Sequence, residues 1–180
     1  TPAIPSGGNF VARFTPNRAG TFIYHTHAAD PEQLTGGVYG PLIVLEPGEK
    51  FDPERDKIVM LGTREADFFA KRITINGEES PSPIVLHSGM QYRLRVINMA
   101  PDLAADFRLG SKEHPVSWRA IAKDGADLPS GSATVSDAAL HIASGEAYDF
   151  EFRPQAAGDI PIQVENILNR AQVLGKIVVH

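Results

Sequence analysis

The 180 residues contain no cysteine, so they cannot form a disulfide, bind a metal through a thiolate or supply a cysteine nucleophile. They also contain no apolar run that approaches the ~18–20 residues of a membrane-spanning helix. Acidic residues (22) outnumber Lys and Arg (17), which gives a formal net charge of −5, and the basic residues form no cluster. This distribution argues against nucleic acid and against an acidic membrane surface as partners.

The composition indicates an all-β protein. Hydrophobic residues make up 42% of the chain, and 16 Gly and 14 Pro punctuate short runs of strand-forming residues. The single helical turn that the sequence suggests lies near Arg64 to Lys71. Strands are expected over residues 10–14, 21–27, 42–45, 57–61, 72–76, 91–98, 118–123, 134–142, 148–153, 160–165 and 173–179. The strands beyond residue 57 have the number and size of a Greek-key β-sandwich.

An internal repeat organises the chain. Residues 6–20 align without a gap onto residues 144–158, and after a short slip Gly40–Val44 resembles Gly175–Val179. The repeat predicts two units of the same fold, each with a strand, a Pro-containing turn, a strand, a Gly loop and a final strand. Only five residues precede the first copy, whereas a long segment precedes the second, so we expect the chain to begin inside a domain.

These observations predict two domains joined by a linker. Residues 1–46 are expected to be the C-terminal part of a first domain, and residues 57–180 a complete second domain. The polar linker, residues 47–56, carries Pro47 and Pro53, which limit the slack between the units.

One pair of histidines stands out. Because side chains two residues apart on a strand point to the same face, His25 and His27 are expected to lie side by side. Imidazole is a good ligand for copper, zinc, iron and nickel, although two rings alone hold such a metal weakly. In the second copy of the repeat, Gln163 and Glu165 stand at the equivalent positions, so that copy lacks the pair.

The motifs around the pair resemble those of laccase-like multicopper oxidases. In the first unit they are Gly20-Thr21-Phe22-Ile23-Tyr24-His25-Thr26-His27, with Gln33 and Gly37-Val38-Tyr39-Gly40-Pro41-Leu42-Ile43-Val44 downstream. In the second they are Ile75-Asn76-Gly77, Gly89-Met90-Gln91-Tyr92-Arg93-Leu94-Arg95-Val96-Ile97-Asn98, Asp124-Gly125 and Ser144-Gly145-Glu146-Ala147-Tyr148-Asp149. The resemblance implies a cupredoxin-like Greek-key β-sandwich, with the end of a first cupredoxin domain followed by a whole second one.

The resemblance also implies a function. His25 and His27 would bind the two type 3 coppers of a trinuclear cluster, whose other ligands lie outside this chain, on missing domains of the parent or on another subunit. The parent would oxidise a phenol, an amine or a metal ion by one-electron steps and reduce dioxygen to water, in the periplasm or outside the cell. No blue copper site can form without cysteine, and the segment alone is expected to be inactive.

Two other functions stay open. His25, His27 and Glu32 nearly fit the two-histidine, one-glutamate set of a cupin, which would bind a single metal. Alternatively the sandwich is a structural or interaction scaffold and the histidine pair is vestigial.

The remaining polar residues of interest are expected to be structural. His87, His114 and His141 are interpreted as ordinary surface or strand histidines, and His180 as a residue that could border a linker. Arg93 and Arg95 are expected on a solvated or interdomain face, opposite the inward-facing Leu94 and Val96. Turn and strand-entry roles are assigned to Asp124, Gly125 and Glu146, and support of the histidine loop to Gln33, Tyr39 and Pro41.

Overall fold

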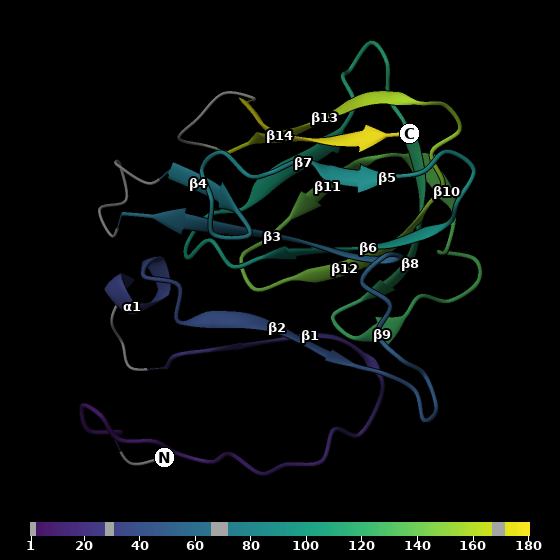
Figure 1. Cartoon of the computed structure of the whole chain (residues 1–180). Coiled ribbons are helices and arrows are strands. Elements are labelled where there is room, and N and C mark those ends of the chain that lie inside the picture. The colour runs from purple at the N-terminus through teal and green to yellow at the C-terminus, as the bar shows by residue number, and fades with distance from the viewer. Residues whose placement is uncertain (1–2, 28–30, 66–71, 167–171) are drawn as a thin grey trace.

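Two curled sheets form most of the molecule in this computed structural model, which describes residues 3–27, 31–65, 72–166 and 172–180 (Figure 1). The larger sheet has the strand order β10-β8-β12-β6-β3-β4, with β9 paired to β8, and the smaller has the order β11-β7-β13-β14-β5. Neighbours are antiparallel except β3 with β6 and β5 with β14. This architecture confirms the predicted all-β, cupredoxin-like sandwich.

The elements of the first part of the chain are β1 (Gly20–His25), α1 (Pro31–Thr35), β2 (Tyr39–Val44), β3 (Asp56–Arg64), β4 (Arg72–Ile75), β5 (Ile84–Leu86), β6 (Tyr92–Asn98) and β7 (Ala105–Leu109). They are followed by β8 (Ser117–Lys123), β9 (Ala126–Asp127), β10 (Val135–Asp137), β11 (Ala139–Ile142), β12 (Ala147–Phe152), β13 (Gly158–Glu165) and β14 (Gln172–Val179).

The main hydrophobic core lies between the two larger sheets. Leu94 and Val96 are buried in it, as their alternation with the arginines predicts. Trp118 stacks on Phe150 with ring centroids 3.6 Å apart, and Phe107 from the opposite sheet lies parallel to Trp118 with ring centroids 6.1 Å apart. These three aromatic rings therefore join the two sheets through a region from which water is excluded.

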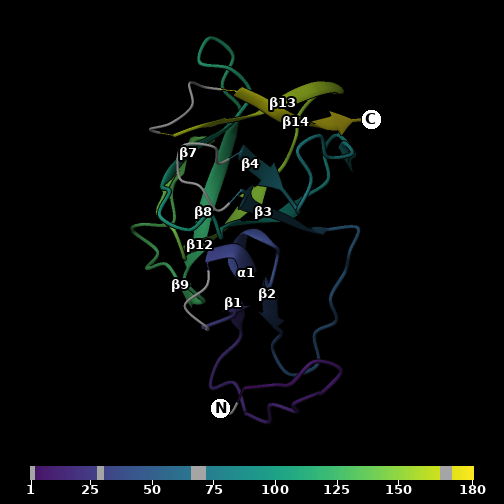
Figure 2. The ribbon, with the colours of Figure 1, turned by 90° about the vertical axis from the view of Figure 1, so that its left-hand side faces the viewer.

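The β1–β2 hairpin forms a separate two-stranded sheet beside the sandwich. In Figures 1 and 2 it lies below β3 and β12, and the N-terminal segment passes beneath it. Its register places Gly20 opposite Val44 and Tyr24 opposite Gly40. The β13–β14 hairpin has the same register from Gly158 opposite Val179 to Ile162 opposite Gly175, after which its register shifts between Ile162 and Gln163. The sequence repeat is therefore a repeat of hairpin geometry, while the division into two domains stays a prediction.

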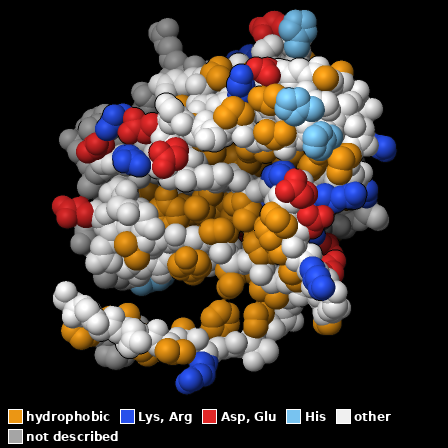
Figure 3. All heavy atoms as spheres, viewed as in Figure 1, with side chains coloured by type: hydrophobic (Ala, Val, Ile, Leu, Met, Phe, Trp, Pro, Cys, Tyr) orange, Lys and Arg blue, Asp and Glu red, His pale blue; other side chains and the backbone are white. Residues whose placement is uncertain are grey.

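The strand predicted over residues 10–14 is wrong. Its counterpart in the repeat lies in β12, which is hydrogen-bonded to β6 on one side and β8 on the other. Residues 10–14 pair with no strand of the described chain, and all five are exposed. Ile4, Phe10, Val11 and Phe14 are 48–67% exposed, and Figure 3 shows hydrophobic side chains along this segment.

Other elements also differ from the prediction or lie outside its reach. The single strand expected over residues 134–142 is two strands, because Ala138 is fully buried where the chain passes from β10 in one sheet to β11 in the other. The sequence did not predict β5, β7, β9 or the short helix α1. The helical turn expected near Arg64 to Lys71 falls mostly outside the described residues.

Candidate metal centre

The hairpin fixes the backbone that carries the histidine pair. His25 is the last residue of β1 and lies opposite Tyr39 on β2. The pairing continues one residue further, since the Thr26 N–H donates to the Val38 carbonyl at 3.1 Å. The chain is therefore held extended up to the residue before His27.

The two imidazoles lie against each other. Their centroids are 4.7 Å apart with an interplanar angle of 29°, and both side chains are exposed. The Nδ1 atom of His25 lies 2.8 Å from the carbonyl oxygen of Thr26. Because a carbonyl only accepts, Nδ1 must donate, and in the neutral ring Nε2 then keeps its lone pair for a metal. Such a hydrogen bond on the second nitrogen is common for metal-binding histidines.

The helix α1 supports the loop behind the pair. The Thr26 hydroxyl donates to Gln33 Oε1 at 2.6 Å, and the Val38 N–H donates to the Gln33 carbonyl at 2.9 Å. Gln33 thus connects both ends of the loop, in the supporting role that the sequence predicts for it. Thr26, the residue between the two histidines, is therefore held by α1, while His25 and His27 are exposed.

Close packing anchors the hairpin on the sandwich. A Cβ atom at Gly62 of β3 would lie 2.0 Å from the Tyr39 hydroxyl, so only glycine admits the tyrosine there. Tyr39 and Ile23 pack against a small cluster that Ile97, Met99 and Ala147 form. Burial raises the pKa of the Tyr39 hydroxyl above its ordinary value.

A buried network of charges forms a second anchor. Thr21 of β1 donates to Asp149 Oδ2 at 2.9 Å, and Arg95 Nη1 donates to Thr21 Oγ1 at 2.7 Å and to Asp149 Oδ2 at 3.1 Å. Arg93 also bonds Asp149, and Arg95 bonds Asp56. Arg95 is only 3% exposed, so of the two predicted environments it occupies the one between hairpin and sandwich.

Sequence reasoning placed the arginines on this face but missed their partner. Asp149 lies opposite Arg95 in the β12–β6 ladder, so both side chains share a face. The alternation of Asp149 with the core residue Phe150 places Asp149 on the face opposite the core, but only the pairing of β12 with β6 shows that it meets Arg95. Lys123 and Glu146 form another pair, at 2.6 Å, and this hydrogen bond lowers the pKa of Glu146 and raises that of Lys123.

The described residues hold no group of three or more His, Cys, Asp or Glu placed to bind one metal ion. The cupin set of His25, His27 and Glu32 is therefore not formed in them. His114 is exposed, and His141 Nδ1 lies 2.8 Å from Asp106 at the surface of the smaller sheet, which fits their interpretation as surface residues. His87, interpreted as an ordinary histidine, and His180, interpreted as a residue that could border a linker, lie together with ring centroids 6.3 Å apart.

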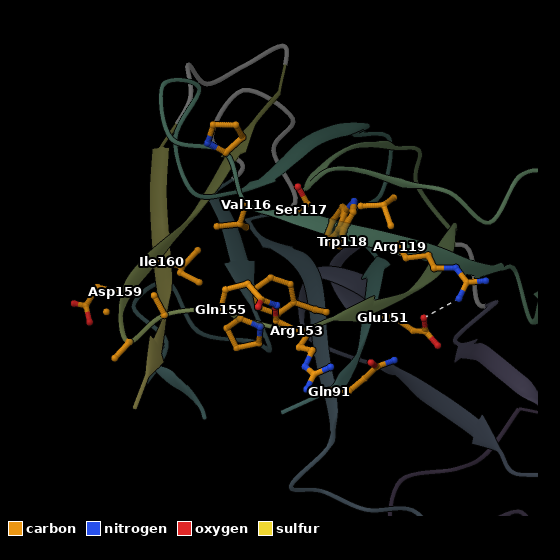
Figure 4. A pocket seen from close by; sticks show the side chains of 17 residues that line it. Gln91, Val116, Ser117, Trp118, Arg119, Glu151, Arg153, Gln155, Asp159 and Ile160 are labelled. Carbon is orange, nitrogen blue, oxygen red and sulfur yellow. Dashed lines mark hydrogen bonds and ion pairs between the residues drawn. The ribbon is translucent and has the colours of Figure 1, made fainter. Parts of the chain in front are cut away.

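A cavity of about 680 Å³ lies away from the histidine pair. Trp118, Phe152 and Ile160 line it, and the ion pair between Arg119 and Glu151 lies along one side (Figure 4). No histidine takes part in its lining.

No helix among the described residues is long and apolar enough to cross a membrane.

The chain thus combines a cupredoxin-like sandwich with an exposed pair of imidazoles, which are donors for a transition metal. The comparisons with known proteins agree. A family model described as multicopper oxidase matches residues 1–49. The copper resistance protein A homolog of Pseudomonas syringae pathovar tomato is 45% identical over 60 residues, covering 32% of this chain and 10% of that protein. Laccase-1 of Fomitopsis schrenkii is 29% identical over 135 residues, covering 59% and 23%.

The crystal structure of blue copper oxidase from Nitrosomonas europaea has the same fold, with a TM-score of 0.74 and 25% identity, covering 96% of this chain and 60% of that one. The chain spans between about a tenth and a quarter of these two curated relatives. In sequence and in fold the chain is similar to laccase-like multicopper oxidases, which confirms the resemblance that its motifs indicate.

Proposed function

We propose that this chain supplies His25 and His27 as ligands to the type 3 coppers of a trinuclear cluster in a copper-dependent oxidase. The observation that carries the proposal is the stacked, exposed imidazole pair, in which the hydrogen bond from His25 Nδ1 leaves Nε2 available for a metal. The multicopper oxidase match over residues 1–49 includes both histidines.

The donors fit copper, because imidazole is a ligand of suitable softness and both rings are exposed and stacked beside each other. Two rings are too few for a firm site, so the remaining ligands come from another part of the parent protein or from another subunit. When complete and loaded with copper, the centre supplies the four-electron reduction of dioxygen to water, using electrons from a small phenol, amine or metal-ion substrate.

The rest of the chain would orient the pair. The hydrogen bond between Thr26 and Gln33 fixes the loop, and the network around Asp149 fixes β1 on the sandwich. The sandwich itself then serves as the middle scaffold domain of the oxidase. Placement in the periplasm or outside the cell is part of the proposal, as suggested by the likeness to multicopper oxidases.

Copper titration of the purified chain tests the ligand role. We expect the unchanged chain to take up copper weakly at His25 and His27, and the His25→Ala, His27→Ala double variant to lose this uptake, because both imidazole donors are gone. The matched control is His114→Ala, His141→Ala, which removes two exposed histidines elsewhere and should keep that copper. Equal binding by the unchanged chain and the first variant would favour the scaffold function instead.

Oxygen consumption with a phenolic substrate tests whether this chain has oxidase activity without the rest of the enzyme. We expect no turnover by the copper-treated 180-residue chain, because its described residues lack a complete ligand set and its sequence lacks the cysteine of a blue copper site. Turnover that survives purification and disappears with a chelator would contradict this assignment.

A further inference from the structure

A second pair of histidines lies at one edge of the smaller sheet, where β5 runs parallel to β14. In this ladder Leu86 is opposite Val179. The pairing continues beyond the two strands, since the His180 N–H donates to the Leu86 carbonyl at 2.9 Å and the Ser88 N–H to the His180 carbonyl at 2.7 Å. His87 and His180 therefore occupy neighbouring positions on adjacent strands.

Both histidines point away from the core. Leu86 and Val179 are 0% and 3% exposed and face inward, so the next residue on each strand faces outward. The two imidazoles are exposed, with centroids 6.3 Å apart and planes tilted by 45°. Within the described chain, neither ring forms a hydrogen bond or an ion pair. Pale-blue histidine side chains gather at the upper right of the face seen in Figure 3, near the C-terminus marked in Figure 1.

The backbone under the pair is fixed. Besides the ladder bonds, the His87 N–H donates to the hydroxyl of Tyr92 at 2.6 Å, and Tyr92 is a core residue that is 2% exposed. A metal ion about 2 Å from one nitrogen of each ring bridges imidazoles whose centroids are about 5 to 6 Å apart. Rotation of either exposed ring about its side-chain bonds closes the small remaining difference.

We propose that His87 and His180 form a second metal site, which chelates a divalent transition metal between two strands. Copper(II) is the ion we expect it to prefer, because nitrogen sites bind divalent first-row metals most tightly at copper. Water completes the coordination at this exposed position. The site does not depend on the proposed function, since it uses neither His25 nor His27 and lies on a different sheet.

The experiment measures Cu²⁺ binding calorimetrically in the His25→Ala, His27→Ala background, so that the first pair cannot contribute. We expect one Cu²⁺ to remain bound there, with nitrogen coordination visible by electron paramagnetic resonance. Adding His87→Ala or His180→Ala should weaken this binding by about 100-fold, because each removes half of a chelate. Adding His114→Ala instead should leave it unchanged. All of these side chains are exposed, and circular dichroism verifies that each variant is folded.

Two results would overturn the second site: an absence of Cu²⁺ binding in the His25→Ala, His27→Ala background, or binding there that neither His87→Ala nor His180→Ala weakens. Failure of the proposed function looks different. In that case the unchanged chain and the background variant bind the same amount of copper, and binding at His87 and His180 persists.

Discussion

At the scale of single residues, the buried carboxylate of Asp149 connects β1 to the sandwich. It is 1% exposed and accepts hydrogen bonds from Thr21, Arg93 and Arg95. Replacing it by Asn leaves the buried Arg95 with only one of its two acidic partners. Since breaking a buried ion pair is strongly unfavourable, we expect Asp149→Asn to lower the free energy of unfolding by about 3 kcal/mol, measured by urea denaturation.

Glu151→Gln is the matched control for this prediction. Glu151 lies on the same strand and pairs with Arg119 at 3.2 Å, but the two side chains are 34% and 46% exposed. An ion pair in that environment contributes less than about 1 kcal/mol. Equal losses in the two variants would mean that the network around Asp149 is no stronger than a surface pair.

The pair of Lys123 and Glu146 makes a prediction about pH. The hydrogen bond from Lys123 lowers the pKa of Glu146 below its ordinary value of 4.5 in the folded chain. Its contribution is therefore fully present above that ordinary value and is lost as the pH falls through the lowered pKa. Because both groups are partly exposed, the contribution is less than about 1 kcal/mol.

Glu146→Gln tests this assignment. The difference in unfolding free energy between the unchanged chain and the variant should be largest near pH 6 and should shrink as the pH drops below about 4.5. If the unfolding free energies of the unchanged chain and of Glu146→Gln instead changed in parallel from pH 6 to pH 3, folding would not lower the pKa of Glu146.

Much of the histidine site could be predicted at this scale, and the reason is local. The two-residue period of a strand is enough to place His25 and His27 side by side, and the loop motif points to Gln33 as a support. The partnership of Arg95 with Asp149 and Thr21 could not be predicted, because the three residues come from different strands. Their meeting depends on which strands pair, and that information is not local.

At the scale of elements, the hairpin that carries the site is held by tight packing as well as by charge. The Tyr39 hydroxyl lies over Gly62, where a Cβ would be 2.0 Å away. Gly62→Ala should push Tyr39 out and destabilise the chain by about 1–3 kcal/mol. The amides of β2 should then exchange with deuterium faster, while those of β6 and β12 change less.

Gly131→Ala is the control, because a Cβ at Gly131 meets no atom within 4 Å. It should leave both the stability and the exchange of β2 unchanged. Unaltered β2 exchange in Gly62→Ala would show that Tyr39 does not anchor the hairpin.

The comparison of the two hairpins shows what an internal repeat can and cannot predict. The register that β1–β2 and β13–β14 share as far as Ile162 follows from equivalent residues at equivalent spacing. Residues 10–14 resemble those of β12 but do not form a strand. β12 has β6 and β8 as hydrogen-bonding neighbours, whereas the first unit offers no such neighbours within the described residues. A strand pattern therefore specifies which face is apolar but requires partners to become a strand.

At the scale of the whole molecule, composition and turn spacing were sufficient for the fold class but not for the order of strands. The short β5 and the charged β7 gave no clear signal in the sequence, yet they complete the smaller sheet. The parallel contact of β5 with β14 joins residues almost a hundred positions apart in the chain. This contact is what brings His87 to His180, so the second pair could not be found from spacing alone.

In the proposed function, His25 and His27 both bind copper. The most direct measurement is anomalous X-ray scattering at the copper edge from a crystal of the chain grown with copper. We expect a copper peak about 2 Å from a ring nitrogen of each of the two histidines, whether as one shared ion or as two neighbouring ions. Copper peaks found only elsewhere on the molecule, with both of these rings free of metal, would contradict it.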